Sequence, residues 1–264
     1  MLKVGAAIVS VAALAALVGP LLTPFDPAAQ ELPLRLAGPS LTHPLGLDEL
    51  GRDILARVLE GARISFVVGL VVVSISAALG TLLGSIAGYF GGVVDDAISR
   101  LIDMLLAFPG LLLAIAIVAV LGPSLVNVLV ALTIIGWVGY ARLVRGQVLR
   151  AREFEYVQAA RALGAGAPRV LWRHVIPAAI PVVVVQATLG MAGAIIGEAA
   201  LSFLGLGVQS PTPSWGTMLN GGRAHLLDAP HLTLFPGLAI ALLVLGFNFV
   251  GDGLRDLTDP KRET

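Results

Sequence analysis

Long runs of apolar residues constrain the fold of this chain more than any other feature of its sequence. These runs are Val4–Leu22, a stretch within Ile64–Val94, Met104–Ala141, about Ile176–Leu204 and about Leu232–Val250. A helix needs about 20 apolar residues to cross a hydrocarbon core of roughly 30 Å. Since every run is about this long or longer, the chain is predicted to be an all-α integral membrane protein.

The number of crossings follows from the length of the runs. Met104–Ala141 is nearly twice as long as one crossing requires, and Gly122-Pro123-Ser124 interrupts it with turn-forming residues. It therefore predicts two spans, which brings the total to six. The first run follows Lys3, is long for a signal peptide and shows no clear cleavage site, so we read it as a retained span.

Composition excludes several classes of function. Hydrophobic residues make up 57% and charged residues 13% of the chain, with zero net charge, which excludes a soluble domain and makes nucleic acid an unexpected partner. There is no cysteine, and the four histidines are scattered, so neither a disulfide nor a metal site is predicted. No arrangement of serine, histidine and aspartate suggests catalytic residues.

The distribution of basic residues predicts the orientation, because short cytoplasmic segments collect lysine and arginine. Between the fourth and fifth spans stand Arg142, Arg145, Arg150, Arg152, Arg161, Arg169 and Arg173, and the tail adds Arg255, Lys261 and Arg262. The connection between the last two spans has only Arg223. We therefore expect both termini and the arginine-rich loop in the cytoplasm, and the proline-containing segment 26–61 outside. Residues 95–103, with Asp95, Arg100 and Asp103, are expected at a cytoplasmic turn.

The arginine-rich loop has its own predicted structure. A helix from about Glu153 to Leu163 would end at Gly164, and a second helix would begin at Pro168, a residue favoured in the first helical turn. The alanines before Gly164 leave little side-chain bulk, so another protein can approach the backbone closely. Composition alone equally allows a loop that only follows the charge rule and binds anionic lipid.

The spacing within this loop resembles the EAA loop of permease subunits in bacterial ATP-binding-cassette (ABC) importers. Gln158-Ala159-Ala160, Gly164 and the terminal His174-Val175-Ile176-Pro177 stand at the distances of that motif. Glutamine replaces the usual glutamate and histidine the first isoleucine, as in the peptide and nickel branch of the family. In that branch the loop commonly reads as Ala159–Ala165 and Arg173–Pro177 do here.

Similar segments extend over nearly the whole chain. They are His43–Asp53, with Leu47 where threonine is usual, Gly61–Ser65, Gly197–Gly207, Pro211–Gly216 and Asp252–Asp256. The chain thus resembles the C-type permease of a dipeptide, oligopeptide or nickel importer.

The resemblance implies a type I ABC importer permease fold. Residues 1–62 would form the first span and an external connection, 63–254 the permease core with the EAA loop at about 153–177, and 255–264 a cytoplasmic tail. The implied partners are a homologous B-type permease, two cytoplasmic ATPases, an extracytoplasmic binding protein and membrane lipid, in a bacterial or archaeal cell membrane. The implied ATPase-coupling residues are Tyr156, Gln158, Ala159, Ala160, Arg161, Gly164, Arg169, His174 and Pro177.

This chain is not expected to hydrolyse ATP itself. Its only lysines are Lys3 and Lys261, and neither follows the glycine pattern of a phosphate-binding loop. ATP and magnesium are therefore expected on the partner ATPases, with no cofactor on this chain.

Polar and small residues of the fifth span are candidates for the translocation path: Gln186, Gly193, Gly197, Glu198 and Ser202. An ionisable group within a membrane usually faces protein or water. Glu198 would therefore either shape the outer gate and meet a peptide amine, or bond a neighbouring helix while the nearby glycines allow close packing.

Three classes of function remain open. An importer permease for di- or oligopeptides leads, with nickel or another small solute as alternative cargo. A secondary transporter that uses Glu198 for proton coupling would normally show paired internal repeats and broken spans, and neither is evident in the sequence. A membrane enzyme lacks a nucleophile motif. The sequence does not name the cargo.

Overall fold

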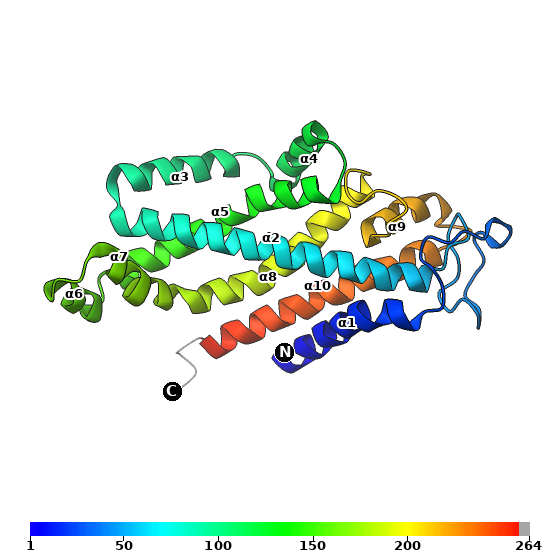
Figure 1. Ribbon diagram of the computed structural model, residues 1–264, viewed down its shortest axis with the longest axis horizontal. Helices are drawn as coiled ribbons and strands as arrows, with labels where there is room; N and C mark the ends of the chain where they lie inside the picture. Colours follow the sequence, from blue (N-terminus) through cyan, green and yellow to red (C-terminus); the bar gives the residue numbers. More distant parts are fainter. Residues whose placement is uncertain (259–264) are drawn as a thin grey trace.

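The computed structural model describes residues 1–258, and most of them are helical (Figure 1). The helices are α1 (Leu2–Leu22), α2 (Ile54–Phe90), α3 (Gly92–Leu106), α4 (Gly110–Leu121), α5 (Leu125–Ala151), α6 (Glu155–Ala162), α7 (Ala167–Val170), α8 (Ile176–Phe203), α9 (Trp215–Gly222) and α10 (His231–Thr258). Two 3₁₀ turns, Leu32–Leu34 and Arg223–His225, and one π-helical turn, Leu171–Val175, complete the helical elements of this region. Residues 1–258 contain no β-strand, so the all-α prediction is confirmed.

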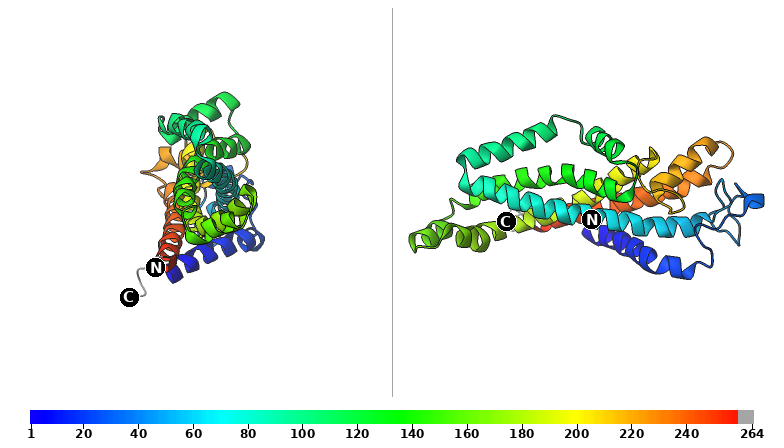
Figure 2. Two further views of the ribbon diagram at one scale, coloured as in Figure 1. Left: turned by 90° about the vertical axis from the view of Figure 1, so that its left-hand side faces the viewer. Right: turned by 45° about the horizontal axis from the view of Figure 1, so that its top comes forward.

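The long helices form one elongated bundle. α2, α5 and α8 run through its middle, α1 and α10 lie together on one side, and α3 and α4 lie on the other (Figures 1 and 2). The α6–α7 segment forms one end of the bundle, and α9 with the connection 23–53 forms the opposite end. The start of α1 lies beside the end of α10, where Gly253 packs against Leu2.

Close packing of α2 on α5 holds the centre of the bundle together. Gly80, Gly84 and Gly88 recur every fourth residue along α2, and each lies directly against α5. A side chain at any of these positions would meet the backbone or Cβ atoms of Tyr140, Ala141 or Val148. Small residues at this spacing let two membrane helices approach closely, so dispersion contacts along their length stabilise the pair.

The third span differs from its prediction. Within residues 1–258, five helices are long and apolar enough to span a membrane, and α3 with α4 supplies a sixth only as a pair bent by 86°. α4 alone has 12 residues and rises about 18 Å, which is too short for a crossing. The chain breaks at Ala107–Pro109 because proline has no backbone N–H to donate and disfavours helical geometry in the residue before it. The predicted turn after this span, at Gly122–Ser124, is confirmed.

Residues 95–103 do not form the predicted turn. The chain reverses at Gly91 and Gly92, which have φ angles of +67° and +54° that glycine tolerates best. Asp95 and Asp103 therefore lie on α3, where Asp95 pairs with Arg145 of α5 at 2.5 Å. This ion pair joins two helices.

α2 begins earlier than the sequence pattern suggested. It starts at Ile54, with the Asp53 carboxylate accepting the Ala56 N–H at 2.8 Å, so the predicted boundary between residues 62 and 63 falls inside a helix. With 37 residues, α2 is about 55 Å long and exceeds the hydrocarbon core at one end. Residues 54–61 thus extend the bundle toward the connection 23–53.

Charged side chains fasten the connection 23–53 to this end of α2. Arg52 donates to Asp48 at 2.6 Å, and Arg57 donates to the Pro27 carbonyl at 2.9 Å and lies 3.4 Å from Asp48. His43 bonds Asp53 at 2.8 Å. Asp48, Arg52 and Arg57 are buried, which is tolerable only because these charges face one another. The connection is consequently packed onto the bundle.

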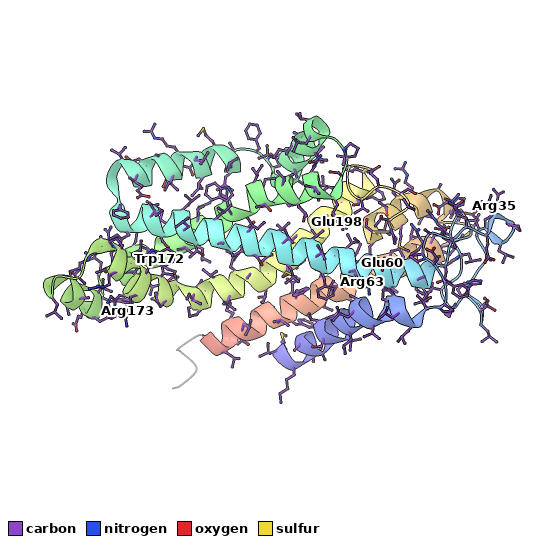
Figure 3. The ribbon with its side chains drawn as sticks, in the orientation of Figure 1. Arg35, Glu60, Arg63, Trp172, Arg173 and Glu198 are labelled. Atoms are coloured by element: carbon purple, nitrogen blue, oxygen red, sulfur yellow. The ribbon has the colours of Figure 1, made fainter. Side chains whose placement is uncertain are left out.

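Arg63 joins α2 to α1 at a weak point of α1. Pro20 cannot donate to the Ala16 carbonyl, which therefore lacks its helical partner. The Arg63 guanidinium supplies the missing bonds, donating to the carbonyls of Ala16 at 2.7 Å and Leu17 at 3.1 Å. Figure 3 shows Arg63 on α2 where α1 passes, next to Glu60, to which it is also paired.

The remaining span predictions agree with the structure. α8 ends within a residue of the predicted fifth span, and α10 contains the sixth and continues to Thr258. Residues 255–258 of the expected tail are therefore helical. Lys261 and Arg262 lie outside the described residues.

Candidate functional site

The loop between α5 and α8, residues 152–175, folds into a helix, a tight turn and a second helix. α6 ends in a hydrogen-bond pattern in which the Ala165 N–H donates to the Ala160 carbonyl at 3.0 Å and the Gly164 N–H to the Arg161 carbonyl at 2.9 Å. This is the Schellman motif, whose central residue adopts a left-handed conformation, and Gly164 has φ +83°. Gly164 is thus where α6 must stop.

The loop is anchored to the bundle by a compact apolar cluster. Val157 of α6, Val170 of α7 and Val175 of the π-helical turn are fully buried against Val144 and Val148 of α5. Their burial removes these side chains from water and stabilises the loop by about 1.5–3 kcal/mol each.

Hydrogen bonds close the loop on itself. The Tyr156 hydroxyl donates to the His174 carbonyl at 3.2 Å, and the Gln158 amide donates to the Arg152 carbonyl at 3.2 Å. These two bonds tie α6 to the segments that enter and leave the loop. The loop therefore moves with α5 and α8.

The opposite face of α6 projects away from the bundle. Ala159, Ala162 and Gly164 are exposed, and Leu163 has 89% of its surface exposed. Arg161 lies over the Tyr89 ring of α2 at 5.0 Å, and Arg169 is exposed on α7. An apolar leucine among small side chains, flanked by two cations, is the kind of surface that a protein partner with acidic residues can cover.

The observed loop differs from its prediction in its boundaries. α6 is shorter than the predicted helix at 153–163, and the second helix begins at Ala167 and runs through the π-helical turn directly into α8. His174 is half-buried within this turn, and Pro177 is exposed at the second position of α8. A continuous helix from α7 to α8 connects the loop rigidly to the membrane part. Gly164, the predicted end of the first helix, lies before it.

A central cavity of about 380 Å³ lies between α2, α4, α5 and α8. Of the predicted path residues, Gln186, Gly193 and Gly197 line it, together with Gly190. These four positions recur at three- and four-residue intervals and therefore share one face of α8. None of the residues that line the cavity is charged.

Glu198 and Ser202 do not line this cavity. They lie on another face of α8, and both side chains are fully buried. The Ser202 hydroxyl donates to the Glu198 carboxylate at 2.6 Å and accepts the Val208 N–H at 3.3 Å. Figure 3 marks Glu198 far from Trp172 and Arg173, which lie at the α6–α7 end. Glu198 thus takes part in packing at the end of the bundle where α9 lies.

α9 is held in place by capping and by one aromatic side chain. Ser214 caps its first turn by accepting the Thr217 N–H at 3.3 Å, and the Trp215 indole donates to the Val58 carbonyl of α2 at 2.9 Å. Gly61 leaves room for the Trp215 ring. Trp215 is 2% exposed and packs inside the protein.

The sequence analysis missed three polar or small residues of the cavity, Ser76, Gly136 and Tyr140. They lie in uncharged runs of α2 and α5, outside the motifs that resemble the family, so nothing marked them as functional. The available signal was the four-residue interval between Gly136 and Tyr140 on α5 and between Ser76 and Gly80 on α2. No group of three or more metal-binding side chains occurs within residues 1–258.

The protein is a bundle of membrane-length helices, with an uncharged cavity between four of them and an anchored helical loop at one end. These features are those of a polytopic membrane transport subunit. A family model described as "Binding-protein-dependent transport system inner membrane component" matches residues 80–264. The chain belongs to this family of ABC permease subunits.

Several curated proteins resemble nearly the whole chain. The dipeptide transport system permease protein DppC of Alkalihalophilus pseudofirmus is 48% identical over 99% of this chain and 86% of its own length. The glutathione transport system permease proteins GsiD of Pectobacterium atrosepticum and of Escherichia coli are 49% and 52% identical over 85% of this chain and 74% of their own length.

A solved structure shares the fold. The methionine ABC transporter MetNI, in inward facing conformations, matches with a TM-score of 0.63 and 18% identity, covering 77% of this chain and 97% of that chain. The predicted type I importer permease fold is confirmed by this match.

Proposed function

We propose that this chain is the permease subunit that forms half of a peptide translocation path in an ATP-driven importer. The α5–α8 loop carries the proposal, because it presents an exposed helix on a rigid base at the end of an otherwise apolar bundle. The proposal treats residues 63–254 as the permease core and 1–62 as an added span with its external connection.

The charge distribution supports an orientation with the α6–α7 end in the cytoplasm. Arg142, Arg150, Arg169 and Arg173 lie on or beside the α5–α8 loop, whereas acids and bases mix at the α9 end. In this orientation both termini are cytoplasmic, and the connection 23–53 is external. The proposed location is a bacterial or archaeal cell membrane.

Coupling to ATP hydrolysis follows from the geometry of the loop. In the proposal, α6 docks into one of two cytoplasmic ATPase subunits, which carry the ATP and magnesium. Because α7 continues into α8, movement of the docked helix is transmitted along α8 to the cavity. The residues assigned to this contact are the exposed Gln158, Ala159, Gly164 and Arg169, while Tyr156 and His174 hold the loop in shape.

The cavity supports the second half of the proposal. It is bounded by this chain on four helices, and a homologous permease is the proposed partner that would complete the path. An extracytoplasmic binding protein would deliver the cargo. Relatives that carry dipeptides and glutathione share cargo with amide bonds, so a small peptide is the proposed substrate class.

The first test is ATP hydrolysis and uptake by the purified complex. The chain would be co-purified with the products of its neighbouring genes, reconstituted in liposomes, and assayed with its binding protein and dipeptides, longer peptides, glutathione or nickel. We expect ATP-dependent uptake and stimulated hydrolysis with one of the peptide classes. Stimulation by nickel alone would contradict the peptide cargo. Failure of any ATPase to co-purify would contradict the importer function and favour a secondary transporter.

A further inference from the structure

The polar side chains that line the central cavity are few and uncharged. They are Ser76 of α2, Tyr140 of α5 and Gln186 of α8. The Tyr140 hydroxyl makes a long contact of 3.4 Å with the Gln186 main-chain carbonyl. The side chains of Ser76 and Gln186 add a hydroxyl and an amide to the same wall.

Glycines on the facing helices bring these groups together. An added Cβ at Gly136 of α5 would lie 2.5 Å from the Ser76 hydroxyl, and one at Gly190 of α8 would lie 2.5 Å from the Tyr140 hydroxyl. Gly136 and Tyr140 are one turn apart on α5, as Gln186 and Gly190 are on α8. Any larger residue at either glycine would push a polar group out of place. The three polar groups therefore line one continuous strip across three helices.

Ser76 is the least satisfied member of this strip. It is 1% exposed, and its hydroxyl has no hydrogen-bond partner among residues 1–258. Leaving a buried hydroxyl without a partner costs free energy. A ligand that enters the cavity and bonds Ser76 recovers this cost, which is the arrangement expected where polar groups orient a bound molecule.

We propose that Ser76, Tyr140 and Gln186 form a contact site for the neutral amide groups of the cargo during its passage. Together they offer donors and acceptors that match the N–H and carbonyl of a peptide bond. No charged residue lines the cavity to pair with or repel a cargo side chain. The site contacts the peptide main chain and does not discriminate between cargo side chains of different charge. This inference rests on the proposed function and adds the chemistry of its path.

The test uses the whole complex in liposomes, with uptake of dialanine measured beside ATP hydrolysis stimulated by the loaded binding protein. The double variant Ser76→Ala/Tyr140→Phe removes both hydroxyls with little change in shape. We expect its uptake to fall about fivefold or more, as for the loss of one or two hydrogen bonds, with stimulated hydrolysis retained. The control is Thr188→Val on α8, because the Thr188 hydroxyl donates to the Val185 carbonyl of its own helix and Thr188 does not line the cavity.

A second variant tests indifference to charge. In the parent complex, alanyl-glutamate, alanyl-lysine and dialanine should be taken up at similar rates once each is bound to the binding protein. Gln186→Glu places a negative charge on the strip and should lower the uptake of alanyl-glutamate relative to alanyl-lysine by about tenfold.

The outcomes separate the inference from the proposed function. Parental uptake in the double variant, an equal fall in uptake and hydrolysis, or an unchanged ratio in Gln186→Glu would each overturn the contact site while leaving the importer intact. Absence of ATP-dependent uptake in the parent would overturn the proposed function, and the contact site with it.

Discussion

Gly164 allows the docking surface and the fold of the loop to be tested separately. Its φ of +83° places it in the left-handed region, yet no atom within residues 1–258 lies within 4 Å of a Cβ added there, apart from its own neighbours in the chain. A side chain at Gly164 therefore costs conformational energy without a clash inside the described part of the chain. For an ordinary residue this cost is about 1–2 kcal/mol, and asparagine tolerates the conformation better.

The size of this conformational cost decides what each variant of Gly164 should do. A cost of about 1.4 kcal/mol lowers the population of the intact turn relative to an opened one by about tenfold. Val157 and its neighbours hold the loop by several times that energy, so Gly164→Ala should keep the loop folded. Gly164→Asn should lose even less. Gly164→Leu adds a bulky side chain next to the exposed Leu163 and should obstruct a partner that approaches α6.

The assay is co-purification of the ATPase subunits with each variant, together with stimulated ATP hydrolysis. We expect retention with Gly164→Asn, partial loss with Gly164→Ala and nearly complete loss with Gly164→Leu, while the isolated permease in detergent loses no more than about 1–2 kcal/mol of stability. Gly146, which also has open space but lies within α5, provides the matched control in Gly146→Leu. Full ATPase binding by Gly164→Leu would refute the assignment of α6 as the docking helix.

Three further predictions follow from the packing. Glu198→Ala leaves the buried Ser202 hydroxyl without its 2.6 Å partner and should destabilise the protein by about 2 kcal/mol. Glu198→Gln should cost less than about 1 kcal/mol. Thermal unfolding measures both variants, and equal melting temperatures would contradict this prediction. Arg63→Met removes the donors to the Ala16 and Leu17 carbonyls and should speed hydrogen exchange in residues 14–22, while α10 stays protected; unchanged exchange there would show that Arg63 does not hold α1. Gly193→Leu has room for its side chain within the cavity and should block uptake by about tenfold or more without loss of stability, so parental uptake would exclude Gly193 from the path.

Much of the candidate site could be read from the sequence because it depends on local signals. The loop motif predicted that α6 ends at Gly164, and the structure shows a left-handed turn there. This turn depends on the local sequence, because glycine adopts the left-handed conformation readily. Gln186, Gly193 and Gly197 share one helical face by their spacing alone. Their position on the cavity wall follows once that face is turned inward.

Glu198 shows where such reasoning stops. As an ionisable residue in an apolar span it was a natural candidate for the path, yet it is turned away from the cavity and bonded to Ser202. Helical periodicity states which residues of α8 lie together, but only the neighbouring α9 decides which face of α8 is covered by protein. The same limit applies to Ser76 and Tyr140, whose meeting requires three helices in register.

The sequence by itself determined the class of this protein, its helical spans with one exception, the helical loop at 152–175 and the family, because apolar length, charge placement and short motifs act locally along the chain. Tertiary structure alone decided the 86° bend between α3 and α4 and the start of α2 at Ile54, next to the ion pairs of the connection 23–53. It decided the bond of Arg63 to the carbonyl that Pro20 leaves without a partner. It also decided which polar groups share the cavity. These features depend on the distance and angle between helices, which side-chain packing sets across residues far apart in the chain.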